Sequence, residues 1–275
     1  MKIARIFTGD ISNQKGKFNN VIERIKHLNK VQDIESDNYL IQYHYTWSFR
    51  LFKSINNQCK FELQTKVDGV TLINIWVKMS LLEYLMVHKL KLKDVECKKQ
   101  LNTHISTFKD YNLLTTHDLL SSYLAIKAKE QYNTPFVITW HGSDINKYSY
   151  RSKKTYNFIK LCLEQASMNF FVSKALLRKS DEITQTQNKT HLYTGPSEIF
   201  YKKKSDEVND FKRELNITTK YVVGFIGNLE PIKNVLTLPS IFYAIQNELK
   251  DVSFLIIGDG RLKNDLSKKI RLVGV

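Results

Sequence analysis

The sequence lacks long hydrophobic runs and an N-terminal leader pattern. Its uninterrupted apolar segments stay far below the roughly 18 residues that a membrane span needs. The first ten residues, MKIARIFTGD, alternate and reach a Gly-Asp turn, whereas a signal peptide is first charged and then apolar. We therefore expect a cytoplasmic chain that is soluble or lies peripherally on the inner face of the plasma membrane.

Cysteine is scarce, and no metal-binding pattern is present. The three cysteines, Cys59, Cys97 and Cys162, have neither metal nor redox spacing, and their odd number argues against a disulfide framework. No Asp-x-Asp occurs, and the seven histidines show no ligand spacing. A reducing cytoplasm fits this composition, and neither a metal nor another cofactor is implied.

Acidic residues are few relative to basic ones. The chain has 42 Lys and Arg against 27 Asp and Glu, which gives a formal charge of +15. Such an excess predicts an anionic partner, which could be nucleic acid, an acidic membrane surface or a phosphorylated substrate. Nucleic acid is the weakest of these options, because the lysines are spread along the chain and no recognition motif appears.

Candidate strands alternate with helical segments over the first two thirds of the chain. The helical stripes are Phe18, Val21, Ile22, Ile25 and Leu28, and then Leu119, Leu120, Tyr123, Leu124 and Ala128. The candidate strands are 2–7, 39–45, 111–116, 135–140, 168–173 and 190–194. This alternation predicts an α/β fold with a parallel sheet and helices on both faces.

A second α/β unit begins after a charged stretch. We expect a first domain over 1–195, and a linker plus the first half of a second domain over 196–275. The second unit reads as strand 221–227, helix 234–249, strand 252–258 and helix 261–271. Two parallel strands are fewer than a stable parallel sheet usually has. We therefore expect that the natural chain continues past Val275 or that the gene is truncated.

The stretch GFIGNLEPIKNV places a glycine and a lysine after a strand of this second unit. Gly227 ends the strand, and Lys233 stands where the next helix is expected to begin. Open α/β sheets bind ligands at this edge, and a helix start offers free N–H groups to a phosphate. The pattern predicts a diphosphate site, although Lys233 could equally decorate a solvated helix start.

Five motifs in this order resemble the family-four (group 1) glycosyltransferases of GT-B fold. They are FVITWHGSDI, FFVSKALLRKS, YTGPSEIFYK, GFIGNLEPIKNV and FLIIGDGRLKNDL. The resemblance implies two Rossmann-like domains, the first for the acceptor and the second, here incomplete, for the donor. It further implies a retaining enzyme of cell-surface polysaccharide assembly that moves a sugar from a nucleotide sugar to a glycan or lipid-linked acceptor.

The resemblance also assigns roles to residues. Gly227 and Lys233 match the residues that hold the donor diphosphate, and Asn228 stands where the family most often has arginine. His141 matches the histidine that reaches the transferred sugar, although a His-Gly pair could also cap a turn. Gly16 matches the loop that covers the donor diphosphate.

Three further cleft candidates come from the same motifs: Lys15, which precedes Gly16 where the family has a glycine pair, and Gly142 and Asp144 of HGSD. A nucleotide-binding P-loop is excluded, because Gly9 is too far from Gly16 and Phe18 replaces the magnesium-binding hydroxyl. The family's glutamate pair, which contacts the donor sugar, would lie beyond Val275.

Residues 76–99 are apolar with interleaved lysines. In this position the resembled family often docks on an anionic membrane, but a packed helix with a solvated basic face fits equally. Two other functions stay open: a non-catalytic truncated remnant or binding subunit, and a nucleotide-sugar epimerase on the same fold.

Overall fold

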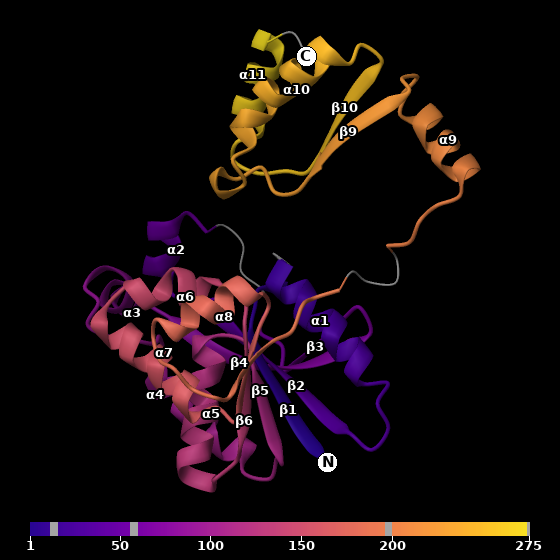
Figure 1. The fold of residues 1–275 in the computed structure, drawn as a ribbon. Coiled ribbons are helices and arrows are strands. Elements are labelled where there is room, and N and C mark those ends of the chain that lie inside the picture. The colour runs from indigo at the N-terminus through magenta and orange to yellow at the C-terminus, as the bar shows by residue number, and fades with distance from the viewer. Residues whose placement is uncertain (12–15, 56–59, 196–199, 274–275) are drawn as a thin grey trace. The chain divides into compact units, whose positions relative to one another are not determined.

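The computed structural model describes residues 1–11, 16–55, 60–195 and 200–273, which form two compact units (Figure 1). Unit 1 comprises Met1–Ser197 and unit 2 comprises Glu198–Val275. Within the described ranges, no helix is both long and apolar enough to cross a membrane.

Unit 1 is built on an eight-stranded sheet in the order β3-β4-β2-β1-β5-β6-β7-β8. Every neighbouring pair is parallel except the hairpin β3–β4. The strands are β1 Lys2–Thr8, β2 Glu35–Tyr45, β3 Gln64–Val67, β4 Val70–Met79, β5 Leu113–Thr116, β6 Phe136–Trp140, β7 Met168–Phe171 and β8 Lys189–His191. The expected α/β architecture with a mostly parallel sheet is confirmed.

Helices cover both faces of this sheet. They are α1 Gly16–Leu28, α2 Trp47–Lys53, α3 Leu81–Tyr84, α4 Lys98–Asn102, α5 Leu119–Tyr132, α6 Ser143–Asn146, α7 Lys153–Gln165 and α8 Lys174–Asp181. Successive strand residues point to opposite faces, so Ile6 and Phe7 enter different apolar clusters. Phe7 packs with the buried stripe of α1, while Ile6 packs in the larger cluster that includes α5 and α7.

One of the two alternatives for residues 76–99, a single packed helix, is wrong. Trp76–Met79 complete β4, whose side chains alternate between buried and exposed, and Ser80 then caps the short helix α3. A π-helical turn follows at Leu85–Lys89. The hairpin that precedes β4 turns at Asp68 and Gly69, which both have positive φ, as a two-residue hairpin loop requires.

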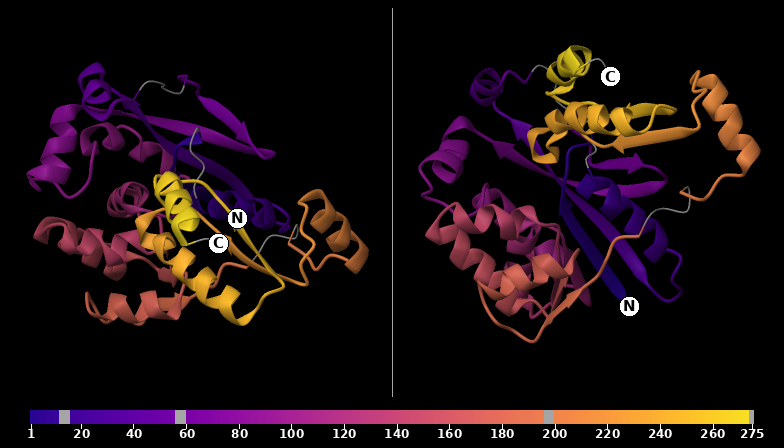
Figure 2. Two further views of the ribbon diagram at one scale, coloured as in Figure 1. Left: turned by 90° about the horizontal axis from the view of Figure 1, so that it is seen from above. Right: turned by 45° about the horizontal axis from the view of Figure 1, so that its top comes forward.

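Unit 2 contains two parallel strands, β9 Tyr221–Ile226 and β10 Val252–Ile257. Its helices are α9 Ser205–Glu214, α10 Leu238–Glu248 and α11 Lys263–Val273, and α10 packs against α11 (Figures 1 and 2). The backbones that follow the two strands touch so closely that a Cβ on Gly258 would lie 1.9 Å from the carbonyl oxygen of Gly227. Only glycine fits there.

The helix after β9 does not begin where the sequence suggested. A 3-10 turn spans Pro231–Lys233, Asn234 adopts the left-handed conformation with φ 51°, and a second 3-10 turn precedes α10. The left-handed residue interrupts the helical path, so α10 starts at Leu238 and not near Asn234. Lys233 therefore ends a 3-10 turn and does not stand at the N-terminus of an α-helix.

Candidate functional site

The carboxyl ends of the central strands of unit 1 bring polar side chains together. Thr8 ends β1, His117 and Asp118 follow β5, and His141 follows β6. These three strands are neighbours in the sheet, so residues far apart in sequence meet at one edge. This is the edge at which open α/β sheets bind ligands.

Asp118 is the most heavily bonded of these groups. Its carboxylate accepts hydrogen bonds from the Thr8 N–H at 2.7 Å, the Thr8 hydroxyl at 2.8 Å and the Ser121 N–H at 3.0 Å, the last as N-cap of α5. The Lys17 ammonium lies 3.0 Å away. Burial alone would raise the pKa of Asp118, but Lys17 and the donated hydrogen bonds hold it well below its usual range. The Asp118 carboxyl is therefore ionised at neutral pH.

Lys17 is the matching cation. Burial is the largest single influence and lowers its pKa, but the charge and hydrogen bond of Asp118, together with Asp144 and Tyr148, outweigh it and leave the pKa raised, so the ammonium stays charged. Sequence reasoning assigned no role to Lys17 or Asp118. A signal existed for Asp118, because Asp118 and Ser121 form a capping box before the apolar stripe of α5.

Two histidines lie against each other beside this ion pair. His117 Nδ1 and His141 Nε2 are 3.1 Å apart, so one ring donates a hydrogen bond to the other. Burial, with the positive charges of Lys17 and Arg24, lowers the pKa of His141 to about 4. Burial and His141 likewise lower the pKa of His117. Both rings are therefore neutral at neutral pH.

A cavity of about 220 Å³ opens next to these groups. Its polar lining includes Lys17, Tyr43, Glu96, Asp118, Ser143, Asp144, Tyr148 and Arg151. Asp144 is only 3% exposed, and burial together with the negative charge of Asp118 raises its pKa to about 7. Gly142, between His141 and the start of α6 at Ser143, has φ 114°, which residues with a side chain rarely adopt. This turn directs the chain from His141 into α6.

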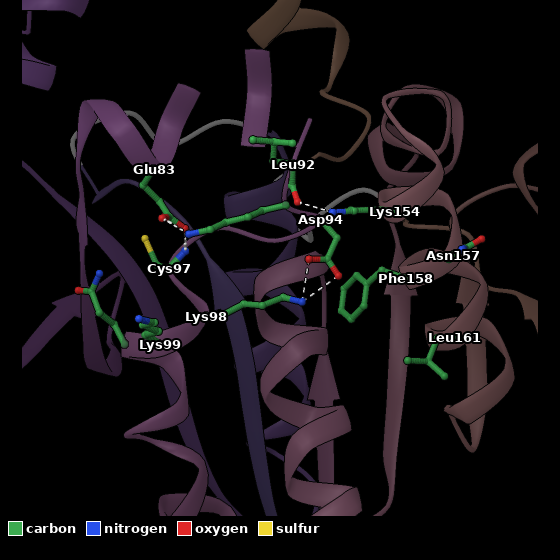
Figure 3. Close-up of a pocket in the computed structure, with 12 residues that line it drawn as sticks. Glu83, Leu92, Asp94, Cys97, Lys98, Lys99, Lys154, Asn157, Phe158 and Leu161 are labelled. Carbon is green, nitrogen blue, oxygen red and sulfur yellow. Dashed lines mark hydrogen bonds and ion pairs between the residues drawn. The ribbon is translucent and has the colours of Figure 1, made fainter. Parts of the chain in front are cut away.

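A larger cavity of about 840 Å³ lies between α4 and α7 and the segment before α4 (Figure 3). Two of its lysines are already in ion pairs, Lys93 with Glu83 at 2.6 Å and Lys98 with Asp94 at 2.7 Å. None of the predicted site residues lines it.

The donor-side candidates are placed within their own units. In unit 2, Gly227 directly follows β9, but its N–H donates to the Ile257 carbonyl at 2.9 Å and is not available to a phosphate. Lys233 is exposed, and no described side chain forms a hydrogen bond or an ion pair with its ammonium. In unit 1, Gly16 is the exposed first residue of α1.

Two further predictions are not tested by the structure. Lys15 lies outside the described residues. Among the described residues, no group of three or more His, Cys, Asp or Glu side chains could hold a metal ion, and the expectation that no metal takes part stays a prediction.

Similarity to known proteins is distant in sequence. No protein-family model matches. A Bacillus subtilis (strain 168) protein named as a teichuronic acid biosynthesis glycosyltransferase, TuaC, is 23% identical over 164 residues, 57% of this chain and 41% of that protein. A Campylobacter jejuni N-acetylgalactosaminyltransferase, whose name specifies an undecaprenol-diphosphate-linked glycan ending in GalNAc, is 27% identical over 156 residues, 54% of this chain and 38% of that protein. The matches thus span about two fifths of each curated relative.

Similarity in fold extends over the whole chain. Anabaena HepE, solved in complex with UDP, aligns with a TM-score of 0.70 at 14% identity, covering 100% of this chain and 66% of that one. The lipopolysaccharide outer core galactosyltransferase WaaB aligns with a TM-score of 0.59 at 15% identity, covering 100% and 65%. These neighbours confirm the GT-B type fold, and the glycosyltransferase relatives confirm the expected resemblance.

Proposed function

We propose that the chain is part of a glycosyltransferase that moves a sugar, with retention, from a nucleotide-sugar donor to a glycan or lipid-linked acceptor in cell-surface polysaccharide assembly. The observation that carries this proposal is the neutral His117–His141 pair at the carboxyl edge of the sheet, beside a cavity with buried carboxyl groups. The glycosyltransferase relatives support the same reaction class.

The protonation state of His141 suits sugar transfer. Cleavage of the bond to the leaving diphosphate develops positive charge on the sugar ring, as in an oxocarbenium-like transition state. A charged imidazolium would oppose that charge, whereas the neutral ring of His141 can hydrogen-bond to a sugar hydroxyl without repulsion. His117 positions this ring through the 3.1 Å contact.

The leaving diphosphate needs positive partners. In unit 2 we assign this role to Lys233, which is exposed and has no partner among the described side chains, and the Asn228 amide can add a neutral hydrogen-bond donor. In unit 1 we propose the N-terminus of α1 at Gly16 as a separate anion-binding element. Helix N-termini stabilise anions through free N–H groups and the helix dipole. UDP in complex with Anabaena HepE supports a nucleoside diphosphate as the common part of the donor.

A membrane surface is the partner that we propose for the apolar face of α2 and α3. The Lys53 ammonium donates to the Tyr84 hydroxyl at 2.9 Å and ties the two helices together. Trp47 is 75% exposed and Leu82 is 67% exposed, and both are large apolar side chains. Exposed Lys53 ends α2 and exposed Lys89 ends the π-helical turn after α3, and such basic side chains favour binding to anionic lipid. This face would place the enzyme at the cytoplasmic side of the membrane, where a lipid-linked acceptor is presented.

The test is nucleoside diphosphate binding by the 275-residue chain. UDP and GDP are titrated calorimetrically against the parent, Lys233→Ala and Lys268→Ala, which removes another exposed lysine of unit 2. A hydrogen bond to a charged group contributes about 1.5–3 kcal/mol, so Lys233→Ala should weaken binding about tenfold or more while Lys268→Ala matches the parent. Equal affinity of both variants would overturn the diphosphate assignment. Incubation with undecaprenyl-diphosphate-linked glycan and nucleotide sugars then distinguishes a transferase from a binding subunit or an epimerase, which would give no new glycosidic bond.

A further inference from the structure

The cavity near His141 is small and partly open, and its lining combines polar side chains with Leu119 and Leu120. Its volume of about 220 Å³ lies below the roughly 300–1,000 Å³ of pockets that hold drug-sized ligands. Tyr43 comes from the end of β2, Asp118 immediately precedes α5, and Tyr148 lies in the turn after α6, so three separate segments line the cavity. A single sugar ring suits this volume.

Two carboxyl groups face this cavity from nearly complete burial. Asp144 is 3% exposed and Glu96 is 7% exposed. In the described ranges, the Asp144 carboxyl accepts a hydrogen bond from its own backbone N–H, and no other residue donates one to it, whereas two carboxylate oxygens can accept several. Asp144 therefore has hydrogen-bonding capacity that a ligand hydroxyl can satisfy.

The cations of the cavity are already engaged. Lys17 pairs with Asp118 at 3.0 Å. The Arg151 guanidinium donates to the Asp94 carbonyl at 2.6 Å, and its other nitrogen lies 3.9 Å from Glu96, so two positive charges face two negative ones. Asp144 adds negative charge as it ionises, and Tyr148 adds none because burial raises its pKa. The lining is neutral to negative.

We propose that this cavity holds one electrically neutral sugar ring of the acceptor, with Asp144 accepting a hydrogen bond from a ring hydroxyl, and that it rejects a ring bearing a carboxylate or phosphate. That this ring belongs to the acceptor rests on the proposed function, whereas the preference for a neutral ring can be measured without any sugar transfer. An anionic ring would face Asp144 and Glu96 without an unengaged cation to pair with, and like charges at close range in a buried site repel strongly.

The experiment measures binding of methyl hexoside, methyl N-acetylhexosaminide and methyl hexuronide by ligand-observed NMR, with the 275-residue chain at pH 6 and pH 8. The neutral glycosides should bind, and the hexuronide should bind about tenfold or more weakly at pH 8. The difference in affinity should narrow at pH 6, where Asp144 is mostly protonated while Asp118 and Lys17 keep their charges. Binding of the hexuronide as tight as that of the neutral glycosides at pH 8 would overturn the proposal.

A matched pair of variants locates the effect. Asp144→Asn keeps the shape and removes the charge, so it should abolish most of the discrimination at pH 8. Asp110→Asn changes the net charge by the same amount at an exposed position and should leave the discrimination between neutral and anionic sugars intact. If Asp144→Asn does not fold, Glu96→Gln provides the same comparison from the other carboxyl. Unchanged discrimination in the folded variant would refute the role of Asp144, whereas neutral-sugar binding without any transfer would refute only the proposed function.

Discussion

Replacing Lys17 by methionine tests the ion pair on which the strand-end site depends. The substitution leaves Asp118 buried and charged with its hydrogen bonds from Thr8 and Ser121 but without a cation. Breaking a buried pair by removing one partner costs about 3–5 kcal/mol. Because the Lys17 side chain is 32% exposed, water replaces part of the lost interaction, and we expect about 2–3 kcal/mol of lost unfolding free energy.

The same helix provides a matched control. Lys26 is also 32% exposed and pairs with Glu23 at 2.7 Å, but Glu23 is 39% exposed and solvated. A surface pair of this kind contributes about 0–1 kcal/mol, so Lys26→Met should cost little. The comparison separates loss of a lysine from α1 from loss of the buried pair.

Urea unfolding followed by tryptophan fluorescence measures both variants. The three tryptophans, Trp47, Trp76 and Trp140, all lie in unit 1, so the signal reports this unit. Adding Asp118→Asn to Lys17→Met should recover part of the loss, since no unpaired charge then remains buried. An equal cost for Lys17→Met and Lys26→Met would refute the reasoning. An independent readout is the imidazole titration of His141, whose pKa should rise when the positive charge of Lys17 is removed.

Two further predictions concern acid stability and membrane binding. His141 has a folded pKa of about 4 against an unfolded value of about 6.5, so between these values the unfolded chain binds the proton and stability falls as pH falls. Asp144, with its raised pKa, acts in the opposite direction, so the test is a difference: the free energy of unfolding of the parent relative to that of His141→Gln should fall as the pH is lowered from 7 to 5, by up to about 1.4 kcal/mol per pH unit, and parallel curves would contradict this. For the membrane, the chain should sediment at low salt with vesicles that contain phosphatidylglycerol. It should not sediment with vesicles of phosphatidylcholine alone. Trp47→Ser should weaken capture while Leu272→Ser, on the exposed surface of α11, should not, and equal loss in both would argue against the α2–α3 face.

The sequence predicted the central part of the fold because strands buried on both faces leave a clear apolar signal. The strands β1, β5, β6 and β7 were expected within two or three residues of their ends. The hairpin of β3 and β4 was missed even though Asp68-Gly69 is a strong hairpin turn, because the alternating residues of β4 run directly into the apolar and lysine-rich segment after Ser80. The strand in fact ends at Met79, and Ser80 caps the helix that follows.

The site was partly predictable. His141 and Asp144 follow a strand in a short motif, so sequence alone pointed to them, and the structure places both at the sheet edge. The pair Lys17–Asp118 could not be found in the same way, because its members are 101 residues apart and meet only through the pairing of β1 with β5. The start of α10 was misplaced because the apolar spacing after Asn234 suggested a continuous helix, although asparagine is one of the residues that most often adopt the left-handed conformation.

The bonds of Asp118 also bear on the order in which unit 1 folds. Thr8 and Asp118 are separated by 110 residues, and closing so long a loop is slow because its entropy must be lost before any contact forms. The capping bonds to Ser121, in contrast, need only one turn of helix. The helix cap can therefore form early, while the junction of Thr8, Lys17 and Asp118 exists only once β1 has docked beside β5. Any partly folded chain without that docking has no strand-end site, even where the cap of α5 has already formed.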